Sequence, residues 1–135
     1  MEGHEGLILL DTNALIWATS EPERLSKRAM SAIRRANQGT GIAISAISLW
    51  EVALLAAKGR LRMVGTVQSI VAEVSAKVAI RPITVEIAVL ATQLPADYPQ
   101  DPCDRIIGAT ALSEGMTLIT KDSRIRECLQ LPTIW

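Results

Sequence analysis

Four acidic residues stand where apolar runs lead into helical patterns, and their type and placement fit a reaction: Asp11, Glu51, Asp104 and Asp122. In a parallel sheet the strand ends that lead into helices share one edge, so these carboxylates would converge there. Two unit charges ~4 Å apart repel by about 4 kcal/mol at an effective dielectric constant of 20. A divalent cation removes this repulsion, and all-oxygen ligands suit Mg²⁺ or Mn²⁺. The sequence therefore predicts a Mg²⁺ or Mn²⁺ site at this edge.

Each of these acids also has a simpler explanation as a helix cap. Ser48 and Glu51 have the spacing of a capping box, in which the glutamate returns a hydrogen bond to the serine backbone. Asp101 fits the N-cap position before a proline, while Asp11 and Asp122 could each cap the helix that follows. Capping does not require convergence, and neutral Ser, Thr or Asn would serve equally well. Taken together, the four acids favour the metal site.

A carboxylate cluster that holds a cation suits cleavage of phosphodiester bonds. One metal ion makes hydroxide available at neutral pH, and a second one about 3.5–4 Å away would stabilise the leaving oxygen. This chemistry needs neither histidine nor cysteine. The chain has one histidine, His4, and two cysteines, Cys103 and Cys128, too few for a Cys/His zinc cage. We expect both thiols to be reduced and the protein to be cytoplasmic.

The elements that must position these acids alternate along the chain. Short apolar runs predict buried strands at residues 7–10, 42–45, 78–81 and 117–120, with a short fifth at 131–135. Helical periodicity predicts helices over 26–38, 48–58, 64–77, 85–94, 102–114 and 123–129. This alternation predicts a three-layer α/β/α domain with a central, mainly parallel sheet of four to five strands. We expect one domain over residues 1–135, with residues 1–6 as a flexible tail.

Composition limits the class of protein. Of the 135 residues, 49% are hydrophobic, which excludes a disordered chain. No stretch approaches the ~18–20 uninterrupted apolar residues of a membrane span, and the acidic amino terminus is not that of a signal peptide. The three tryptophans are expected in the core or a dimer interface, in preference to stacking on bases: Trp17, Trp50 and Trp135.

The charge distribution is asymmetric although the net charge is zero. Residues 24–62 contain eight Lys and Arg residues and a single acid, Glu51. Such a region either attracts polyanions or forms the solvated faces of helices. Lys58, Arg60 and Arg62 flank a glycine and are the best candidates for phosphate contacts, with a solvated helix end as the alternative.

Several of these motifs, in this order and spacing, resemble those of PIN-domain ribonucleases, especially the VapC-type toxins of toxin–antitoxin modules. The resemblance covers the chain from Leu7 to about Ile134. No single motif is decisive, but the ordered set is specific. The motifs are Leu9–Asn13, Ser45–Glu51, Asp101–Arg105 followed by Ile106–Ala111, and Leu118–Asp122.

The resemblance implies a metal-dependent endoribonuclease that cleaves single-stranded RNA with Mg²⁺ or Mn²⁺. It places the catalytic acids at the four positions above, with Asp11, Asp104 and Asp122 as metal ligands. The other positions that it marks are Asp101 as an auxiliary acid, Asn13 and Thr120 as polar groups that orient ligands or water, and Arg105, which would pair with a carboxylate or contact phosphate. It also implies a homodimer and a small antitoxin whose carboxyl-terminal segment covers the acidic pocket.

Three other functions compete with the toxin. A PIN nuclease that processes RNA as a housekeeping enzyme would carry the same acids. A catalytically inert PIN-like module would bind only RNA or protein, but it has no use for mutually repelling carboxylates. A haloacid-dehalogenase-like phosphatase also places an aspartate after its first strand, but it needs a second aspartate where this chain has Asn13.

Overall fold

The computed structural model of the chain, which describes residues 7–128 and 130–135, is built on a parallel sheet. Five strands lie in the order β3-β2-β1-β4-β5, and every neighbouring pair is parallel. The predicted parallel sheet is therefore confirmed. The strands are β1 (Ile8–Leu10), β2 (Ile42–Ser45), β3 (Ala79–Arg81), β4 (Thr117–Ile119) and β5 (Thr133–Ile134).

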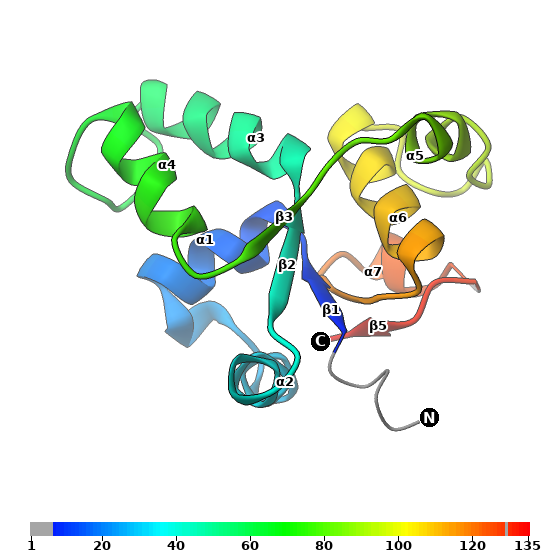
Figure 1. The fold of residues 1–135 in the computed structure, drawn as a ribbon, viewed down its shortest axis with the longest axis horizontal. Helices are drawn as coiled ribbons and strands as arrows, with labels where there is room; N and C mark the ends of the chain where they lie inside the picture. The colour runs from blue at the N-terminus through cyan, green and yellow to red at the C-terminus, as the bar shows by residue number, and fades with distance from the viewer. Residues whose placement is uncertain (1–6, 129) are drawn as a thin grey trace.

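Helices cover both faces of the sheet, which confirms the predicted three-layer architecture. Figure 1 shows α1 to α4 on one side of the sheet and α5 to α7 on the other. The helices of the first side are α1 (Thr12–Ser20), α2 (Lys27–Gln38), α3 (Ala46–Ala57) and α4 (Val67–Ser75), with a short 3₁₀ turn, η2 (Pro22–Arg24), after α1. Those of the second side are α5 (Val85–Ala91), α6 (Pro102–Glu114) and α7 (Ser123–Arg126).

The central strand shows why an unbroken apolar run predicts a strand in this chain. Ile8 and Leu10 pack into the core on the side of α1 to α4, whereas Leu9 packs into the core beneath α6 and α7. Successive side chains of a strand point to opposite faces, and both faces of this sheet are covered. All three residues of β1 are therefore buried.

The observed helices differ from the predicted ones mainly at their ends. The predicted ranges omit α1 and η2, because α1 buries residues 12 and 14–17 and shows little amphipathic contrast. α3 begins two residues early, at Ala46. The predicted extension of α7 to Leu129, and the predicted tail at residues 1–6 with His4, lie outside the described residues. No described helix is long and apolar enough to cross a membrane.

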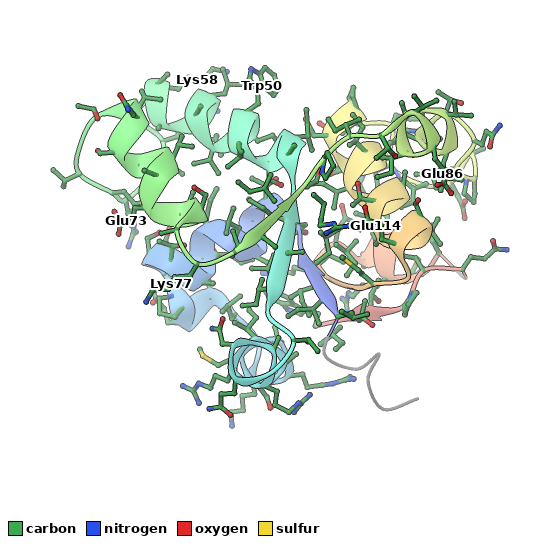
Figure 2. All side chains as sticks on the ribbon, in the orientation of Figure 1. Trp50, Lys58, Glu73, Lys77, Glu86 and Glu114 are labelled. Carbon is green, nitrogen blue, oxygen red and sulfur yellow. The ribbon has the colours of Figure 1, made fainter. Side chains whose placement is uncertain are left out.

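Two of the three tryptophans lie where they were expected. Trp17 is buried in α1, and its ring meets the ring of Trp135 edge to face, with centroids 5.9 Å apart. Trp50 is 57% exposed on the outer face of α3, so the prediction of a core position is wrong for this residue (Figure 2). The alternative prediction, an interface, remains for Trp50.

A close contact between the loop before α6 and α6 itself fixes the start of this helix. The hydroxyl of the buried Tyr98 donates a hydrogen bond to the backbone carbonyl of Asp104, at 2.8 Å. A methyl group at Gly108 would lie 2.2 Å from the Tyr98 hydroxyl oxygen and 2.7 Å from Cζ. Glycine at this position lets the tyrosine reach the first turn of α6.

Replacing Gly108 by alanine should therefore destabilise the protein by about 1–3 kcal/mol, the usual effect of overpacking. At an open helical position the same change stabilises by up to about 1 kcal/mol, so the sign of the effect reports the contact. Urea unfolding of Gly108→Ala measures the change in the free energy of unfolding. Tyr98→Phe, measured in the same way, gives the contribution of the hydrogen bond alone. A Gly108→Ala variant as stable as the parent would contradict the packing described.

Candidate metal centre

The four acids lie at the carboxyl edge of the sheet, where β1 stands between β2 and β4. Asp11 follows β1, Asp122 follows β4, Glu51 lies in the second turn of α3, and Asp104 lies in the first turn of α6. The strand order reverses on either side of β1, and open α/β sheets bind ligands at such a point. The helices that start here bring the acids together from four parts of the chain.

The pKa values of two of these carboxyl groups show how close the charges are. Burial, and after it the negative charges of Asp101, Glu51, Asp11 and Asp122, raise the pKa of Asp104 to about 7. Burial also raises the pKa of Asp11 to about 6, with smaller contributions from Glu51 and Asp122. The charges of Glu51 and Asp122 thus act on both Asp11 and Asp104, as expected of converging acids.

Hydrogen bonds hold Asp11 as the N-cap of α1 while its charge faces the centre. Its carboxylate accepts a hydrogen bond from the backbone N–H of Ala14, at 2.8 Å, and one from the hydroxyl of Thr120. Both bonds lower the pKa of Asp11, but burial outweighs them. The predicted cap and the predicted site residue are therefore the same side chain.

Asp122 differs from Asp11 and Asp104 because it already has a counter-ion. Nη2 of Arg124 lies 2.8 Å from Oδ2 of Asp122, and the backbone N–H of Arg124 donates to Oδ1 at 2.9 Å. These bonds lower the pKa of Asp122 below its ordinary value. This acid is ionised throughout the neutral range.

Glu51 is oriented by two hydroxyl groups that the sequence analysis did not identify as parts of the site. Thr12 donates a hydrogen bond from Oγ1 to Oε1 of Glu51, and the same Oγ1 lies 2.9 Å from Oγ of the buried Ser48. Ser48 stands one helical turn before Glu51, and Thr12 follows Asp11 directly. The spacing of Ser48 and Glu51 was the available signal, but it favoured a capping box.

That capping box is absent, because α3 begins at Ala46 and its N-cap is Ser45. The hydroxyl of Ser45 accepts from the backbone N–H of Ile47, at 3.2 Å. Ser48 and Glu51 therefore lie inside the helix, on the side that faces the metal centre. The N-cap role of Asp101 is confirmed, since its Oδ1 accepts from the N–H groups of Cys103 and Asp104 at 2.8 and 3.1 Å.

Asp101 also lies beside Glu51, as its predicted auxiliary role requires. One ligand atom from each of Glu51, Asp101 and Cys103 lies within 4.8 Å of the others. Burial and the neighbouring acids raise the pKa of the Cys103 thiol to about 12. The thiol is therefore protonated at neutral pH, and soft sulfur does not suit Mg²⁺. The oxygen atoms are the ligands that a hard cation would select.

The two predicted polar groups differ in their surroundings. Thr120 is fully buried and links two of the acids, since its hydroxyl donates to Asp11 and accepts from the backbone N–H of Asp122 at 3.2 Å. Asn13 is exposed in the first turn of α1, beside Asp11. Its side chain faces solvent, where a ligand of the centre would approach.

The predicted phosphate contacts do not belong to the centre. Lys58 and Arg60 are exposed at the far end of α3, and Lys58 lies about 10 Å along the helix axis from Glu51 at 1.5 Å per residue. Nε of Arg62 lies 3.9 Å from Oε1 of Glu21. Figure 2 shows Lys58 at the outer end of α3. Any contact of these cations with RNA would be away from the metal centre.

Arg105 corrects a prediction. Its guanidinium donates to the backbone carbonyls of Ala91 and Leu94, both at 3.0 Å, and of Pro99, at 3.3 Å. These bonds hold the loop between α5 and α6, in place of the predicted pairing with a carboxylate or contact with phosphate. A buried row of carbonyls binds the guanidinium because its five N–H groups form a fixed fork.

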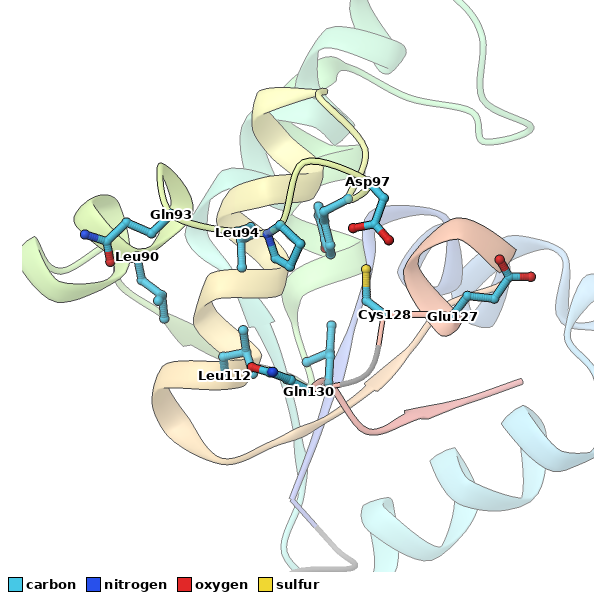
Figure 3. A pocket seen from close by; sticks show the side chains of 11 residues that line it. Leu90, Gln93, Leu94, Asp97, Leu112, Glu127, Cys128 and Gln130 are labelled. Carbon is cyan, nitrogen blue, oxygen red and sulfur yellow. The ribbon is translucent and has the colours of Figure 1, made fainter.

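A cavity of about 300 Å³ lies next to this loop but is separate from the metal centre (Figure 3). Its lining is mainly apolar and includes Leu94, Tyr98 and Leu131, with Asp97 and Cys128 beside them. None of the four acids lines it. The acidic edge of the sheet, not this cavity, therefore remains the candidate functional site.

The donor set of that edge fits a divalent cation. Carboxylate oxygens of Glu51 and Asp101 lie within 4.8 Å of each other, and the charges of both, with those of Asp11 and Asp122, act on Asp104. The raised pKa of Asp104 reflects burial and, after it, repulsion by neighbouring carboxylates, and a cation would remove that repulsion. Oxygen ligands suit hard divalent cations.

Comparison with known proteins assigns the family. The model of the PIN domain matches residues 8–128. The chain belongs to the PIN-domain family. This PIN domain is 40% identical over 119 residues to ribonuclease VapC22 of Mycobacterium tuberculosis, covering 88% of this chain and 89% of that protein. The family resemblance seen in the motifs is thus confirmed.

Solved structures with the same fold come from toxin–antitoxin complexes. One is a toxin–antitoxin complex from Klebsiella pneumoniae, 26% identical, with a TM-score of 0.68 over 95% of this chain and 96% of that one. Another is VapBC2 from Rickettsia felis bound to a DNA fragment from its promoter, with a TM-score of 0.74 over 94% and 96% of the two chains. At 18% identity, the latter shows the fold alone.

The raised pKa values predict how pH and metal change stability. Asp104 and Asp11 have folded pKa values of about 7 and 6, above the ordinary 3.8. Their stabilising contribution is therefore complete below about pH 4 and is lost as pH rises through 6 and 7. Asp104→Asn should melt close to the parent near pH 5, where only part of the contribution is lost, and higher than the parent at pH 8 by roughly 3 °C, the shift that about 1 kcal/mol produces.

Thermal melts in EDTA at the two pH values measure this difference, and melts with Mn²⁺ complete the test. Mn²⁺ should raise the melting temperature of the parent at pH 8 and that of Asp104→Asn much less. If the difference in melting temperature between the parent and Asp104→Asn is the same at pH 5 and pH 8, the pKa of Asp104 is not raised.

Proposed function

We propose that this PIN domain is a metal-dependent endoribonuclease that cleaves phosphodiester bonds of single-stranded RNA. The observation that supports it best is the convergence of the half-buried Asp11, Glu51, Asp104 and Asp122 at one edge of the sheet, where partial burial, and after it the charges of the neighbouring acids, raise the pKa of Asp104. The ribonuclease name of the 40% identical relative supports RNA as the substrate. The cofactor would be Mg²⁺ or Mn²⁺.

Each residue of the centre has a distinct task in this proposal. Asp11, Asp104 and Asp122 would hold the cation, which when bound lowers the pKa of an attacking water and screens the carboxylates from the substrate phosphate. Glu51, fixed by the hydroxyl of Thr12, would accept a proton from that water. Thr120 keeps two of the acids in position through its hydroxyl. Asp101 would add negative charge beside Glu51.

The role that we propose is that of the toxin in a toxin–antitoxin pair. The solved complexes of the same fold support it. A small antitoxin would cover the acidic pocket, and a segment bearing Arg or Lys suits the exposed Asp101 and the partly buried acids. A housekeeping PIN nuclease would use the same centre, so a reading frame for a short DNA-binding protein directly upstream would favour the toxin. Because the chain belongs to the PIN-domain family, we do not retain the phosphatase alternative.

We also propose that the protein forms a homodimer through exposed apolar residues of α3, β3 and α5. Trp50 on α3 is 57% exposed, and Val85 on α5 is 83% exposed. β3 is an edge strand with Ile80 46% exposed, and it lies between these two helices in Figure 1. An apolar surface next to an unpaired strand edge is typical of a protein–protein interface.

Loss of single ligands tests the enzymatic proposal. The parent should cleave a single-stranded oligoribonucleotide in Mg²⁺ or Mn²⁺ and not in EDTA. Asp11→Asn and Asp104→Asn should each lower the cleavage rate at least about 100-fold, the range of groups that act directly on the reaction. Thr12→Val should lower it about 10-fold, as for residues that orient a ligand. Gel analysis of a labelled RNA measures all three rates.

Glu73→Gln is the matched control, because Glu73 is exposed on α4, on the outer side of the molecule (Figure 2). It removes one carboxylate and should cleave at the rate of the parent. Normal cleavage by both Asp11→Asn and Asp104→Asn would exclude this site. An absence of cleavage in the parent, with no Mn²⁺ binding by calorimetry up to millimolar concentration, would favour the inert module.

Trp50→Glu tests the dimer. A charge at this position would be buried in the interface, so the variant should be monomeric at concentrations where the parent is a dimer. Light scattering coupled to gel filtration gives the mass of each, and Trp50→Phe, which keeps the apolar surface, should remain dimeric. An unchanged mass for Trp50→Glu would place the interface elsewhere.

A further inference from the structure

Helix α2 presents an uncompensated row of cations to solvent. Its twelve residues include Lys27, Arg28, Arg34 and Arg35, all exposed, and no acid. The opposite side of α2 buries Ala29, Ala32, Ile33 and Ala36 in the core. A helix face that is merely solvated usually alternates charges of both signs, because pairs four residues apart stabilise it. The sequence of α2 lacks such pairs and instead concentrates positive charge.

The first half of α2 forms one wall of a shallow cavity that fits a phosphate group. The cavity measures about 290 Å³ and is lined by Lys27, Arg28, Ser31, Arg35 and Ile134 of β5. Nη1 of Arg35 donates to the hydroxyl of Ser31 at 2.8 Å, which orients the guanidinium along the helix. Three cations and a hydroxyl line it, without a carboxylate among the lining residues. Phosphate oxygens are the natural acceptors for such a set.

A chain of cations joins this cavity to the metal centre. Lys121 precedes Asp122 in the sequence, and its Nζ lies 5.8 Å from the centroid of the Trp17 ring. Cζ of Arg24 lies 4.4 Å from the centroid of the same ring, and Arg24 stands three residues before Lys27, where α2 begins. The edge contact with Trp135 holds this ring in place. Cations therefore follow one another from the acidic edge to α2.

Two acids lie along this path, Glu21 and the exposed Glu23 of η2, which stands next to Arg24 in the sequence. Oε1 of Glu21 is 3.6 Å from Nη1 of Arg24 and 3.9 Å from Nε of Arg62. Two cations share the carboxylate of Glu21, and neither acid belongs to α2, whose own cations have no acid within the helix. Arg62, predicted as a phosphate contact, thus lies near the path through Glu21, while Lys58 and Arg60 remain at the end of α3.

We propose that Lys121, Arg24, Lys27, Arg28 and Arg35 form a cationic track that binds phosphates of the RNA on one side of the cleaved bond. The inference rests on the proposed endoribonuclease function, because it places the cleaved phosphodiester at the acidic end of the track. An extended polyanion with one charge per residue would contact the acidic edge, the cations at Trp17 and the cavity on α2 in turn. Single-stranded RNA has that shape, and its affinity then depends on counterion release.

Binding in EDTA separates the track from catalysis. Fluorescence anisotropy of a fluorescein-labelled single-stranded oligoribonucleotide gives its Kd for the parent and for Arg28→Ala/Arg35→Ala. The double variant should bind the RNA at least 5-fold more weakly than the parent. Its plot of log K against log salt concentration should be shallower by about 1, because each lost phosphate contact removes ~0.7 from the slope. The matched control is Lys58→Ala/Arg60→Ala, which loses the same charge outside the track and should bind within 2-fold of the parent.

Cleavage in Mg²⁺ or Mn²⁺ provides the second measurement. The track variant should cleave a long oligoribonucleotide with a raised KM and a nearly unchanged kcat, because the metal centre is intact. Its melting temperature should match that of the parent, since both arginines are exposed. Arg28→Lys/Arg35→Lys should recover most of the lost affinity.

The failures of the two proposals are distinguishable. If the parent cleaves RNA and the track variant binds and cleaves like it, the track is wrong and the endoribonuclease stands. If both double variants weaken binding equally, only net charge matters and the track is also wrong. If the parent binds RNA through the track but never cleaves it with metal, the enzymatic proposal fails and the track stands. If the track variant loses binding to an acidic protein but binds RNA as the parent does, the cations of α2 bind protein, and the proposal of an RNA track is wrong.

Discussion

Repulsion between carboxylates at the carboxyl edge of the sheet is the constraint on which the arrangement of this protein depends. No isolated segment would bring Asp11, Glu51, Asp104 and Asp122 together, because each addition raises the cost of ionising the others. The parallel sheet and its helices impose this arrangement, and the free energy of burying both faces of β1, β2 and β4 offsets the cost. Once the acids are close, a bound divalent cation removes the repulsion between their carboxylates.

The surroundings of the centre reduce the conformational freedom of each acid without neutralising the set. Thr12 and Ser48 orient Glu51, and Thr120 links Asp11 to the loop of Asp122. Neutral hydroxyl groups do this without removing the negative charge that a cation needs. A basic side chain is used only at Asp122, where Arg124 lowers the pKa. The first turn of α6 is fixed from the other side by Tyr98, which bonds to the backbone and leaves the carboxylate of Asp104 free to face the centre.

A net charge of zero conceals two surfaces of opposite sign. Acids concentrate at the sheet edge, whereas cations concentrate on α2 and around the ring of Trp17. Salt screens exposed charges beyond about 8 Å at physiological ionic strength, so a long ligand can contact each of these two surfaces separately. Summed charge therefore says little about the ligands of this protein.

The local sequence determined the elements that carry the centre. The strand at 42–45, the helix at 102–114 and the five-strand sheet followed from apolar runs and caps, since burial on both faces and N-cap chemistry leave local signals. The positions of the four acids followed as well, because parallel strands share a carboxyl edge. What the sequence alone could not determine were contacts between distant segments. Arg105 binds loop carbonyls, Thr12 and Ser48 meet Glu51, and Trp50 faces outward. The direction of a side chain and its partner depend on how helices and loops pack against one another, and no local pattern encodes that packing.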